Sequence, residues 1–171
     1  MASPARRQSS PPETATEVKE IHTRILRLAL GVEESRAYWE HVDPTVPVAA
    51  RAHTAFEQRW FGGKSLERVK FLIASFAQRF DAFPECLPAL KRLVGADPTT
   101  RQLLCHFHVQ LSDPIYRSFT GDALPRRRRL RAPTIDRDGV LRWLRDEHDD
   151  RWSAATGVQF ASKLLSGASE A

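Results

Sequence analysis

Five of the six residues from position 126 to 131 are arginines, and their chemistry is easy to state. Arg126, Arg127, Arg128 and Arg129 are consecutive, and a leucine separates them from Arg131. A guanidinium stays charged at any physiological pH, and its planar fork of N–H donors matches the oxygens of a phosphate. Such a run can contact the DNA backbone or enter a minor groove. Two alternatives stay open: a run that docks on an acidic partner protein, and a solvated loop without a specific role.

A pair of predicted helices follows the arginine run. Apolar residues recur at helical spacing over residues 136–148 and again after Ser153, with a short turn between the two patterns. Thr134 or Asp136 can cap the first helix, and Ser153 can cap the second. This order predicts a helix-turn-helix, in which the start of the second helix faces the base edges of DNA. The side chains that we expect to contact DNA here are Arg151, Ser153, Ala154, Thr156, Gln159 and Lys163.

The turn between these helices is acidic, and this argues against the DNA interpretation. Four carboxylates lie in or next to it, at Asp146, Glu147, Asp149 and Asp150. They would repel phosphates if they faced a DNA groove. The alternative is a plain helical hairpin that completes the core. In either case we expect Trp143, Trp152 and Phe160 to pack the pair against the rest of the domain.

Two other groups of residues suggest chemistry, but neither has the spacing that this chemistry needs. His106 and His108 are two residues apart on a predicted helix, so they point to different faces and cannot easily share a metal ion. The loop 62–65 resembles the end of a phosphate-binding loop, but Gln58 stands where that motif has its first glycine. No catalytic triad or carboxylate pair can be recognised. We therefore expect a protein that is not an enzyme and that uses no metal, cofactor or small-molecule substrate.

The composition is typical of a basic globular protein. The chain has 171 residues, a formal net charge of +5 and 42% hydrophobic residues, which is enough for a packed core. A protein with more basic than acidic residues attracts polyanions such as nucleic acid. The two cysteines form no Cys-x-x-Cys motif, the start of the chain lacks the apolar stretch of a secretory signal, and no run approaches the roughly 20 apolar residues of a membrane span. We expect a cytoplasmic protein with reduced thiols.

Helix caps and helix breakers along the chain predict an all-α fold. We expect a disordered tail over residues 1–13, a helical core domain over 14–120, a basic linker or arm over 121–134, and a helix-turn-helix-like segment packed on the core over 135–171. The predicted core helices cover residues 17–30, 33–41, 49–61, 66–80 and 86–94, and two more begin after the caps Asp97 and Asp113. The helix after Ser65 is the expected centre of the core, because its apolar residues recur at helical spacing up to Phe80.

Several short stretches between Val18 and Leu165 resemble the BrxA family of bacterial phage-defence (BREX) systems. They are Arg59-Trp60-Phe61, Lys64-Ser65 before the long helix, Arg79-Phe80 at its end, the corner Leu111-Ser112-Asp113-Pro114 followed by Phe119, and Trp152, Thr156 and Lys163-Leu164-Leu165. The resemblance implies a small all-helical protein that is not an enzyme, associates with DNA and works beside other phage-defence subunits. We see no room for a β-wing after the second helix of the pair, so DNA contact would depend on the helices and the arginine run.

The residues and the resemblance together predict a DNA-binding accessory subunit of a phage-defence system. The arginine run would hold backbone phosphates of double-stranded DNA, and the helix after Ser153 would supply modest base readout. The alternatives are an adaptor whose basic loop docks on an acidic partner subunit, and an RNA-binding helical protein.

Overall fold

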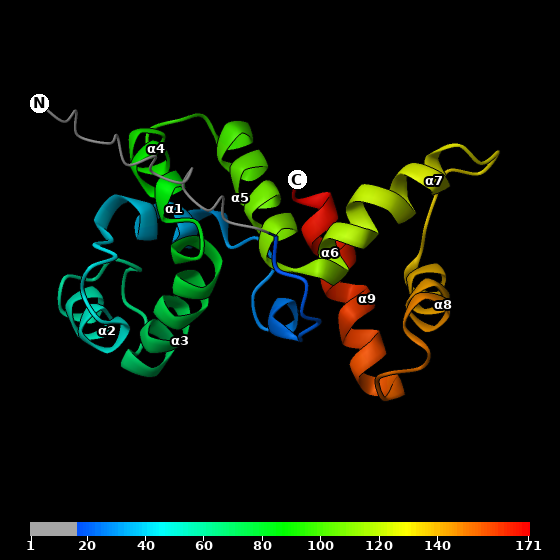
Figure 1. Cartoon of the computed structure of the whole chain (residues 1–171), viewed down its shortest axis with the longest axis horizontal. Coiled ribbons are helices and arrows are strands. Elements are labelled where there is room, and N and C mark those ends of the chain that lie inside the picture. Colours follow the sequence, from blue (N-terminus) through cyan, green and yellow to red (C-terminus); the bar gives the residue numbers. More distant parts are fainter. Residues whose placement is uncertain (1–16) are drawn as a thin grey trace, which may run out of the picture.

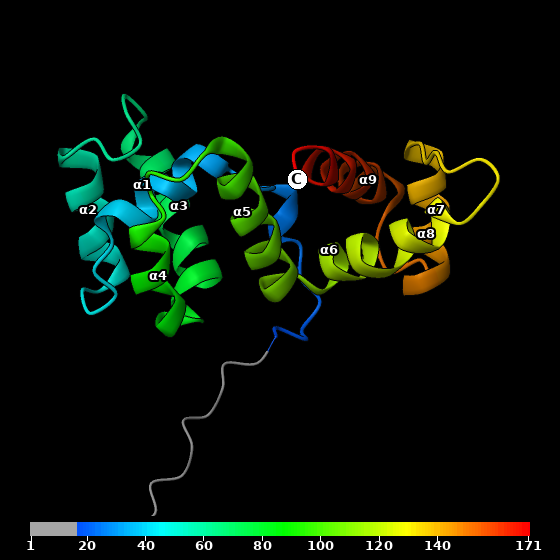
Figure 2. The same ribbon diagram turned by 90° about the horizontal axis from the view of Figure 1, so that it is seen from above.

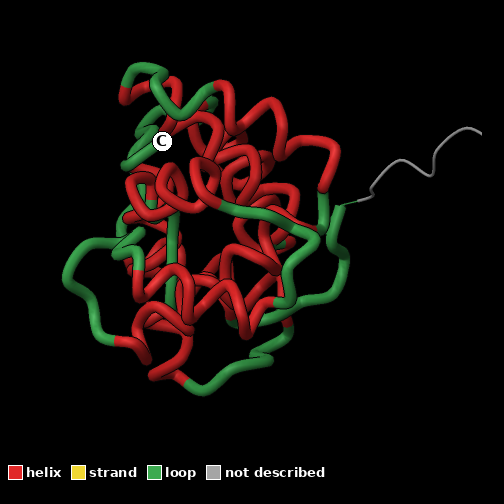
Figure 3. Tube along the Cα trace, turned by 90° about the vertical axis from the view of Figure 1, so that its left-hand side faces the viewer, coloured by secondary structure: helices red, strands yellow, loops and turns green. Residues whose placement is uncertain are grey.

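The protein is all-α, as the sequence predicts. A computed structural model describes residues 17–171, and these residues form helices and loops without any strand (Figure 3). The tail over residues 1–13, which we expected to be disordered, lies outside this range. None of the described helices is long and apolar enough to cross a membrane.

The helices form two groups along the long axis of the molecule (Figure 1). The first group contains the 3-10 helix η1 (Arg24–Leu26), α1 (Val32–His41), α2 (Val48–Glu57), α3 (Leu66–Phe76), the π-helical turn η2 (Ala77–Asp81), the 3-10 helix η3 (Pro84–Cys86), α4 (Leu87–Arg92) and α5 (Pro98–Ser112). The second group contains α6 (Pro114–Ser118), the π-helical turn η4 (Phe119–Ala123), α7 (Leu124–Arg128), α8 (Arg137–His148) and α9 (Ala154–Ser169).

Helix α3 lies at the centre of the first group, as expected. Its Val69, Leu72, Ile73 and Phe76 are buried, and so is Phe80 in the turn that continues it. Helices α1 and α2 pack against it, and aromatic rings of α1 meet Phe76 and Phe80. One apolar cluster continues from here through η1 into the interface of α8 and α9. The two groups therefore share a core.

The predicted caps are where the sequence places them. Ser65, Asp97, Asp113, Asp136 and Ser153 each accept a hydrogen bond from the backbone N–H three residues later, at the starts of α3, α5, α6, α8 and α9. Each bond satisfies one of the N–H groups that a helix start leaves without a partner. These caps explain why helix starts are predicted better than helix ends in this chain.

The segment over residues 17–30 is not the amphipathic helix that its pattern predicts. Only Arg24–Leu26 form a short 3-10 helix, and the segment runs between the two helix groups (Figures 1 and 2). Its backbone bonds to distant residues instead: Val18 N–H donates to Leu111 O over 2.9 Å, and the guanidinium of Arg117 donates to Val18 O over 2.9 Å. Because partners outside the segment satisfy its polar groups, helical bonds are not needed.

The basic linker expected over residues 121–134 is in large part helical. Turn η4 and α7 carry the helix that begins with α6 on to Arg128, so the first arginines of the run belong to a helix and not to a loop. Gly121 and Pro125 do not break it, because Gly121 lies in the π-helical turn η4 and Pro125 follows this turn directly, where the regular α-helical bonding is already interrupted.

Helix α2 also differs from its prediction: it ends at Glu57, before Arg59 takes a left-handed conformation with φ of 53°.

Candidate nucleic-acid interface

The arginine run lies at the end of the molecule farthest from α2, where α7 passes into a projecting loop (Figures 1 and 2). Arg126, Arg127 and Arg128 form the last turn of α7, while Arg129 and Arg131 lie in the loop behind it. All except Arg127 are exposed. Cations at the carboxyl end of a helix also interact favourably with its dipole, so the helix itself gains from this position.

Two of these arginines have a partner within the chain. Arg126 forms an ion pair with Asp122 one turn earlier on the same helix. The Nε of Arg127 donates to Thr134 O over 2.7 Å, which ties the projecting loop back to α7. Arg128, Arg129 and Arg131 form neither a hydrogen bond nor an ion pair through their side chains within residues 17–171. These three guanidinium groups are therefore available to an external anion.

Helices α8 and α9 are joined by a tight turn at the same end of the molecule and cross each other steeply: α9 extends down the view of Figure 1, whereas α8 is foreshortened there and extends fully in Figure 2. Asp149 and Asp150 both adopt left-handed conformations, with φ of 49° and 51°, and this turns the chain within a few residues. Behind the turn, His148 lies between the rings of Trp143 and Trp152, with centroid distances of 5.9 and 5.3 Å. The predicted tryptophan packing therefore occurs, and it fixes how the two helices meet.

The residues predicted to read bases are only partly free to do so. Ser153 accepts a hydrogen bond from Thr156 N, and the two hydroxyls are 3.0 Å apart, so both side chains are engaged in the cap. Gln159 is exposed and Lys163 is half-buried. Arg151 is exposed in the turn, next to two carboxylates. Since Ala154 has no polar side chain, the first two turns of α9 offer Gln159 as their main hydrogen-bonding group.

A hollow between α7 and α8 lies beside the arginine run, and its charge is mixed. It is lined by three arginines, Arg126, Arg127 and Arg142, and by three carboxylates, Asp136, Asp146 and Glu147. The other lining residues carry no charge: Ala123, Leu130, Ile135, Gly139 and Trp143. Of the four acidic residues noted around the turn, Asp146 and Glu147 line this hollow, and Asp150 lines another hollow beside the α8–α9 turn. A phosphate would be attracted more strongly to the outer arginines than to the hollow, where carboxylates offset the arginine charge.

The other candidate motifs have structural partners. Lys64 forms an ion pair with Glu34 over 3.4 Å, and Ser65 caps α3. The residues of this loop that resemble a phosphate-binding loop therefore pair with the core and begin a helix. His106 approaches the Tyr116 hydroxyl to 2.9 Å, whereas His108 is buried against Phe80. Among the described residues, no group of three histidine, cysteine, aspartate or glutamate side chains could hold a metal ion.

Two buried arginines carry contacts that the sequence did not indicate. Arg79 donates to the carbonyls of Leu28, Ala29 and Leu30, over 3.2, 2.7 and 2.7 Å. Arg51 donates to Asp81 over 2.6 Å and belongs to a second buried network. Both side chains stabilise the core, and no local pattern distinguishes them from surface arginines.

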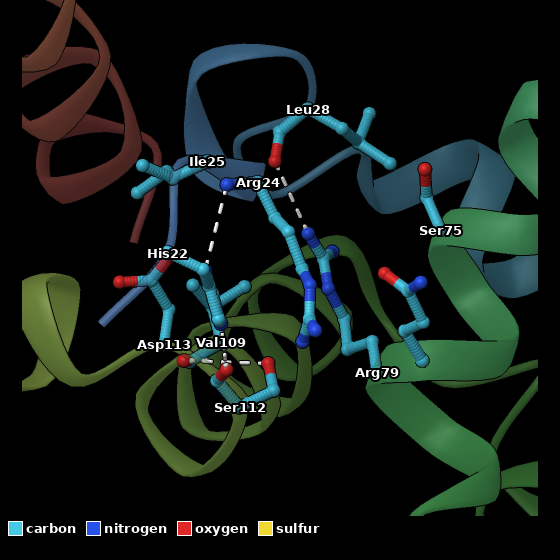
Figure 4. Close-up of a pocket in the computed structure, with 10 residues that line it drawn as sticks. His22, Arg24, Ile25, Leu28, Ser75, Arg79, Val109, Ser112 and Asp113 are labelled. Carbon is cyan, nitrogen blue, oxygen red and sulfur yellow. Dashed lines mark hydrogen bonds and ion pairs between the residues drawn. The ribbon is translucent and has the colours of Figure 1, made fainter. Parts of the chain in front are cut away.

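A polar junction joins the N-terminal segment to the corner between α5 and α6 (Figure 4). His22 contacts Ser112 O over 2.9 Å, and its other ring nitrogen is 3.6 Å from the carboxylate of Asp113. Burial raises the pKa of Asp113, and the hydrogen bond from Tyr116 N–H opposes that change. The junction holds the segment in place, and Ser112 is not a nucleophile in it, because its hydroxyl donates to His108 O over 2.8 Å.

Lowering the pH from 7 to 5 is expected to reduce the free energy of unfolding by about 2 kcal/mol through His108. Burial, assisted by the charge of Arg79, lowers the pKa of His108 to about 4, while histidine in an unfolded chain titrates near 6.5. Between these values the unfolded chain binds a proton that the folded protein does not. Stability therefore falls as the pH drops through about 6.5, and His108 causes no further loss below about 4.

Urea unfolding of the native protein and of His108→Phe at both pH values measures this effect. Phenylalanine keeps a ring beside Phe80 and Phe83 but cannot titrate. We expect the variant to lose about 2 kcal/mol less than the native protein. An equal loss in both proteins would contradict the prediction.

Comparison with protein-family models, with curated proteins and with solved structures finds no match to this chain.

Proposed function

We propose that the protein binds double-stranded DNA through the outer arginines of α7 and its following loop. The observation that carries this proposal is that Arg128, Arg129 and Arg131 are exposed without a partner among the described residues, at one end of the molecule. Phosphates are the groups that such guanidinium forks match best. The contact would be with the backbone, so it would show little dependence on sequence.

Helix α9 would add little base readout in this proposal. Gln159 can reach a base edge, and Lys163 can approach a phosphate, but the cap engages Ser153 and Thr156. Arg151 would contribute charge from the turn. The protein would thus depend on electrostatic attraction, which is strongly salt-dependent.

We further propose that the protein acts in the cytoplasm as a non-enzymatic accessory subunit of a phage-defence assembly. The support for this is the resemblance to the BrxA family in the corner and helix residues named above. Its part would be to hold DNA near the subunits that modify or cleave it. The exposed Leu130 within the arginine run supports the alternative, a partner protein at this surface, because an apolar side chain gains nothing from phosphate.

Fluorescence anisotropy of a labelled DNA duplex, measured over a salt series, tests the proposal. We expect the triple variant Arg128→Gln, Arg129→Gln, Arg131→Gln to bind roughly tenfold more weakly or worse at 0.1 M salt, with the log–log salt slope smaller by about 0.9 for each lost contact. The matched control is Arg59→Gln, Lys91→Gln, Arg92→Gln, which removes the same charge from exposed positions of the first helix group.

The outcomes separate the alternatives. Loss of affinity in the triple variant but not in the control supports DNA binding at the arginine run. Equal weakening of both variants would show that net charge alone attracts the DNA. No binding at low salt would reject the proposal, and tighter binding of an RNA of equal length would favour the RNA alternative.

A further inference from the structure

A second cationic hollow lies in the first helix group, between η1 and α3. It is lined by Thr23, Arg24, Arg27, Phe71, Ala74, Ser75 and Gln78, and no carboxylate is among these residues. The hollow between α7 and α8 and the one beside the α8–α9 turn also contain arginines, but both include carboxylates. The positive charge of the arginines in the η1–α3 hollow is therefore offset by fewer carboxylates than in the other two hollows.

The guanidinium groups around this hollow have no acidic partner among the described residues. Arg24 and Arg27 are exposed and form no ion pair, and the guanidinium of Arg68 lies 4.9 Å from the centre of the Phe71 ring. Phe71 lines the hollow, and Arg68 contacts the ring of Phe71 without lining the hollow itself. The three arginines come from two elements that the shared core holds together.

A smaller pocket continues inward from the hollow, and a buried guanidinium and a buried carboxylate both line it. Arg24, Ser75 and Gln78 line both spaces, and the inner one is closed by Arg79, His22 and Asp113. Figure 4 shows the Arg24 side chain extending into this inner pocket. Arg79 donates only to backbone carbonyls and forms no ion pair among the described residues, so the nearby carboxylate of Asp113, which faces His22, offsets its charge only in part.

The neutral groups of the hollow include further hydrogen-bond donors. The Gln78 amide and the Thr23 hydroxyl form no side-chain hydrogen bond among the described residues, whereas Ser75 already donates to Phe71 O over 2.8 Å. The hollow encloses about 310 Å³, which is at the small end of the range for ligand pockets. Two guanidinium forks with two neutral donors suit a tetrahedral oxyanion and leave room for a group attached to it.

We propose that the η1–α3 hollow is a phosphate-binding site, distinct from the arginine run. Arg24 and Arg27 hold the phosphate oxygens, and Gln78 and Thr23 complete the set of donors. The phosphate belongs either to a nucleic-acid backbone or to a small phosphate ester. This inference does not depend on the arginine run binding DNA, because the two surfaces lie in different helix groups.

Titration of the full chain with inorganic pyrophosphate, followed by amide signals in ¹H–¹⁵N spectra, tests the site. We expect the shifts to concentrate on the amides of η1 and of the last two turns of α3. In Arg24→Gln, Arg27→Gln the affinity should fall roughly tenfold or more, because charge-assisted hydrogen bonds are lost. The control Lys91→Gln, Arg92→Gln removes the same charge from exposed positions of α4 and should bind like the native protein.

Three results would overturn the proposal. They are the absence of shifts at millimolar pyrophosphate, shifts confined to the arginine run, and equal affinity in Arg24→Gln, Arg27→Gln and the native protein. Folding of each variant is checked by its thermal unfolding, and we expect no large change, since neither side chain is buried.

A DNA titration of the same variant identifies the source of the phosphate. If the double variant Arg24→Gln, Arg27→Gln no longer binds pyrophosphate and its DNA binding has a smaller salt slope, the site holds the nucleic-acid backbone. If it loses pyrophosphate but binds DNA unchanged, the site takes a small phosphate ester. Either result supports the site, and neither depends on whether Arg128, Arg129 and Arg131 contact DNA.

Discussion

Replacing Arg79 by methionine is expected to lower the free energy of unfolding by about 3 kcal/mol. Arg79 is buried, and it supplies donors to three consecutive carbonyls of the N-terminal segment. Methionine fills much of the space but donates nothing, so these carbonyls lose a partner away from water. Burial lowers the pKa of Arg79 to about 10, so the guanidinium is still charged at neutral pH and its bonds are charge-assisted.

Urea unfolding measures this loss, and Arg79→Lys is the informative control. Lysine keeps the charge but presents one ammonium in place of a planar fork, so it cannot reach all three carbonyls. We expect its stability to lie between those of the native protein and the methionine variant. If methionine cost less than about 1 kcal/mol, the carbonyls would not depend on Arg79.

Removal of the Asp81 carboxylate is expected to cost about 3 kcal/mol as well. Asp81 accepts hydrogen bonds from Arg51 over 2.6 Å and from the Tyr38 hydroxyl over 2.7 Å, and Arg51 also donates to that hydroxyl. Burial and the hydrogen bond to Asp81 raise the pKa of Tyr38, so the phenol stays a neutral donor. In Asp81→Ala, Arg51 is left as a buried charge without its counterion.

A double-mutant cycle with Arg51→Met tests whether this pair acts as a unit. Without Arg51, the loss of Asp81 leaves no unpaired buried guanidinium, so the double variant should be more stable than the sum of the single effects predicts. Additive effects in urea unfolding would show that the two side chains act independently.

The fold class and most helix positions could be predicted from the sequence. Ser65, Asp97, Asp113, Asp136 and Ser153 are local signals, because a cap acts on a backbone group three residues away. Helix α3 was predicted as the core centre for a similar reason, since its apolar residues share one face. Structural features that depend on residues close together in the sequence can be predicted from it.

The segment over residues 17–30 could not be predicted, because distant residues decide its conformation. Its apolar residues have helical spacing, but its carbonyls bond to Arg79 and Arg117. An arginine in the sequence looks the same whether it faces solvent or donates to a carbonyl fifty residues away. The same limit applies to Arg51 and to the continuation of α6 into the arginine run, where a π-helical turn accommodates residues that normally end a helix.

The η1–α3 hollow had no signature in the sequence. Arg24 and Arg27 lie in a segment whose pattern predicts a helix, and Gln78 lies 51 residues after Arg27. Arg24 and Arg27 come close to Gln78 because the hydrogen bonds of Arg79 hold the segment against α3 and the turn that follows it. Within the arginine run, in contrast, adjacency alone was enough to predict a cationic surface.

The distant partners of the N-terminal segment also determine when it can fold. Val18 bonds to Arg117 across a separation of 99 residues, and closing long loops is slow compared with forming local helices. During synthesis the segment emerges before α5 and α6, and its apolar side chains are covered only after these helices have formed. We therefore expect the nascent chain to expose Ile21, Ile25 and Leu30 until α5 and α6 have been made, which makes this stretch a natural binding site for chaperones.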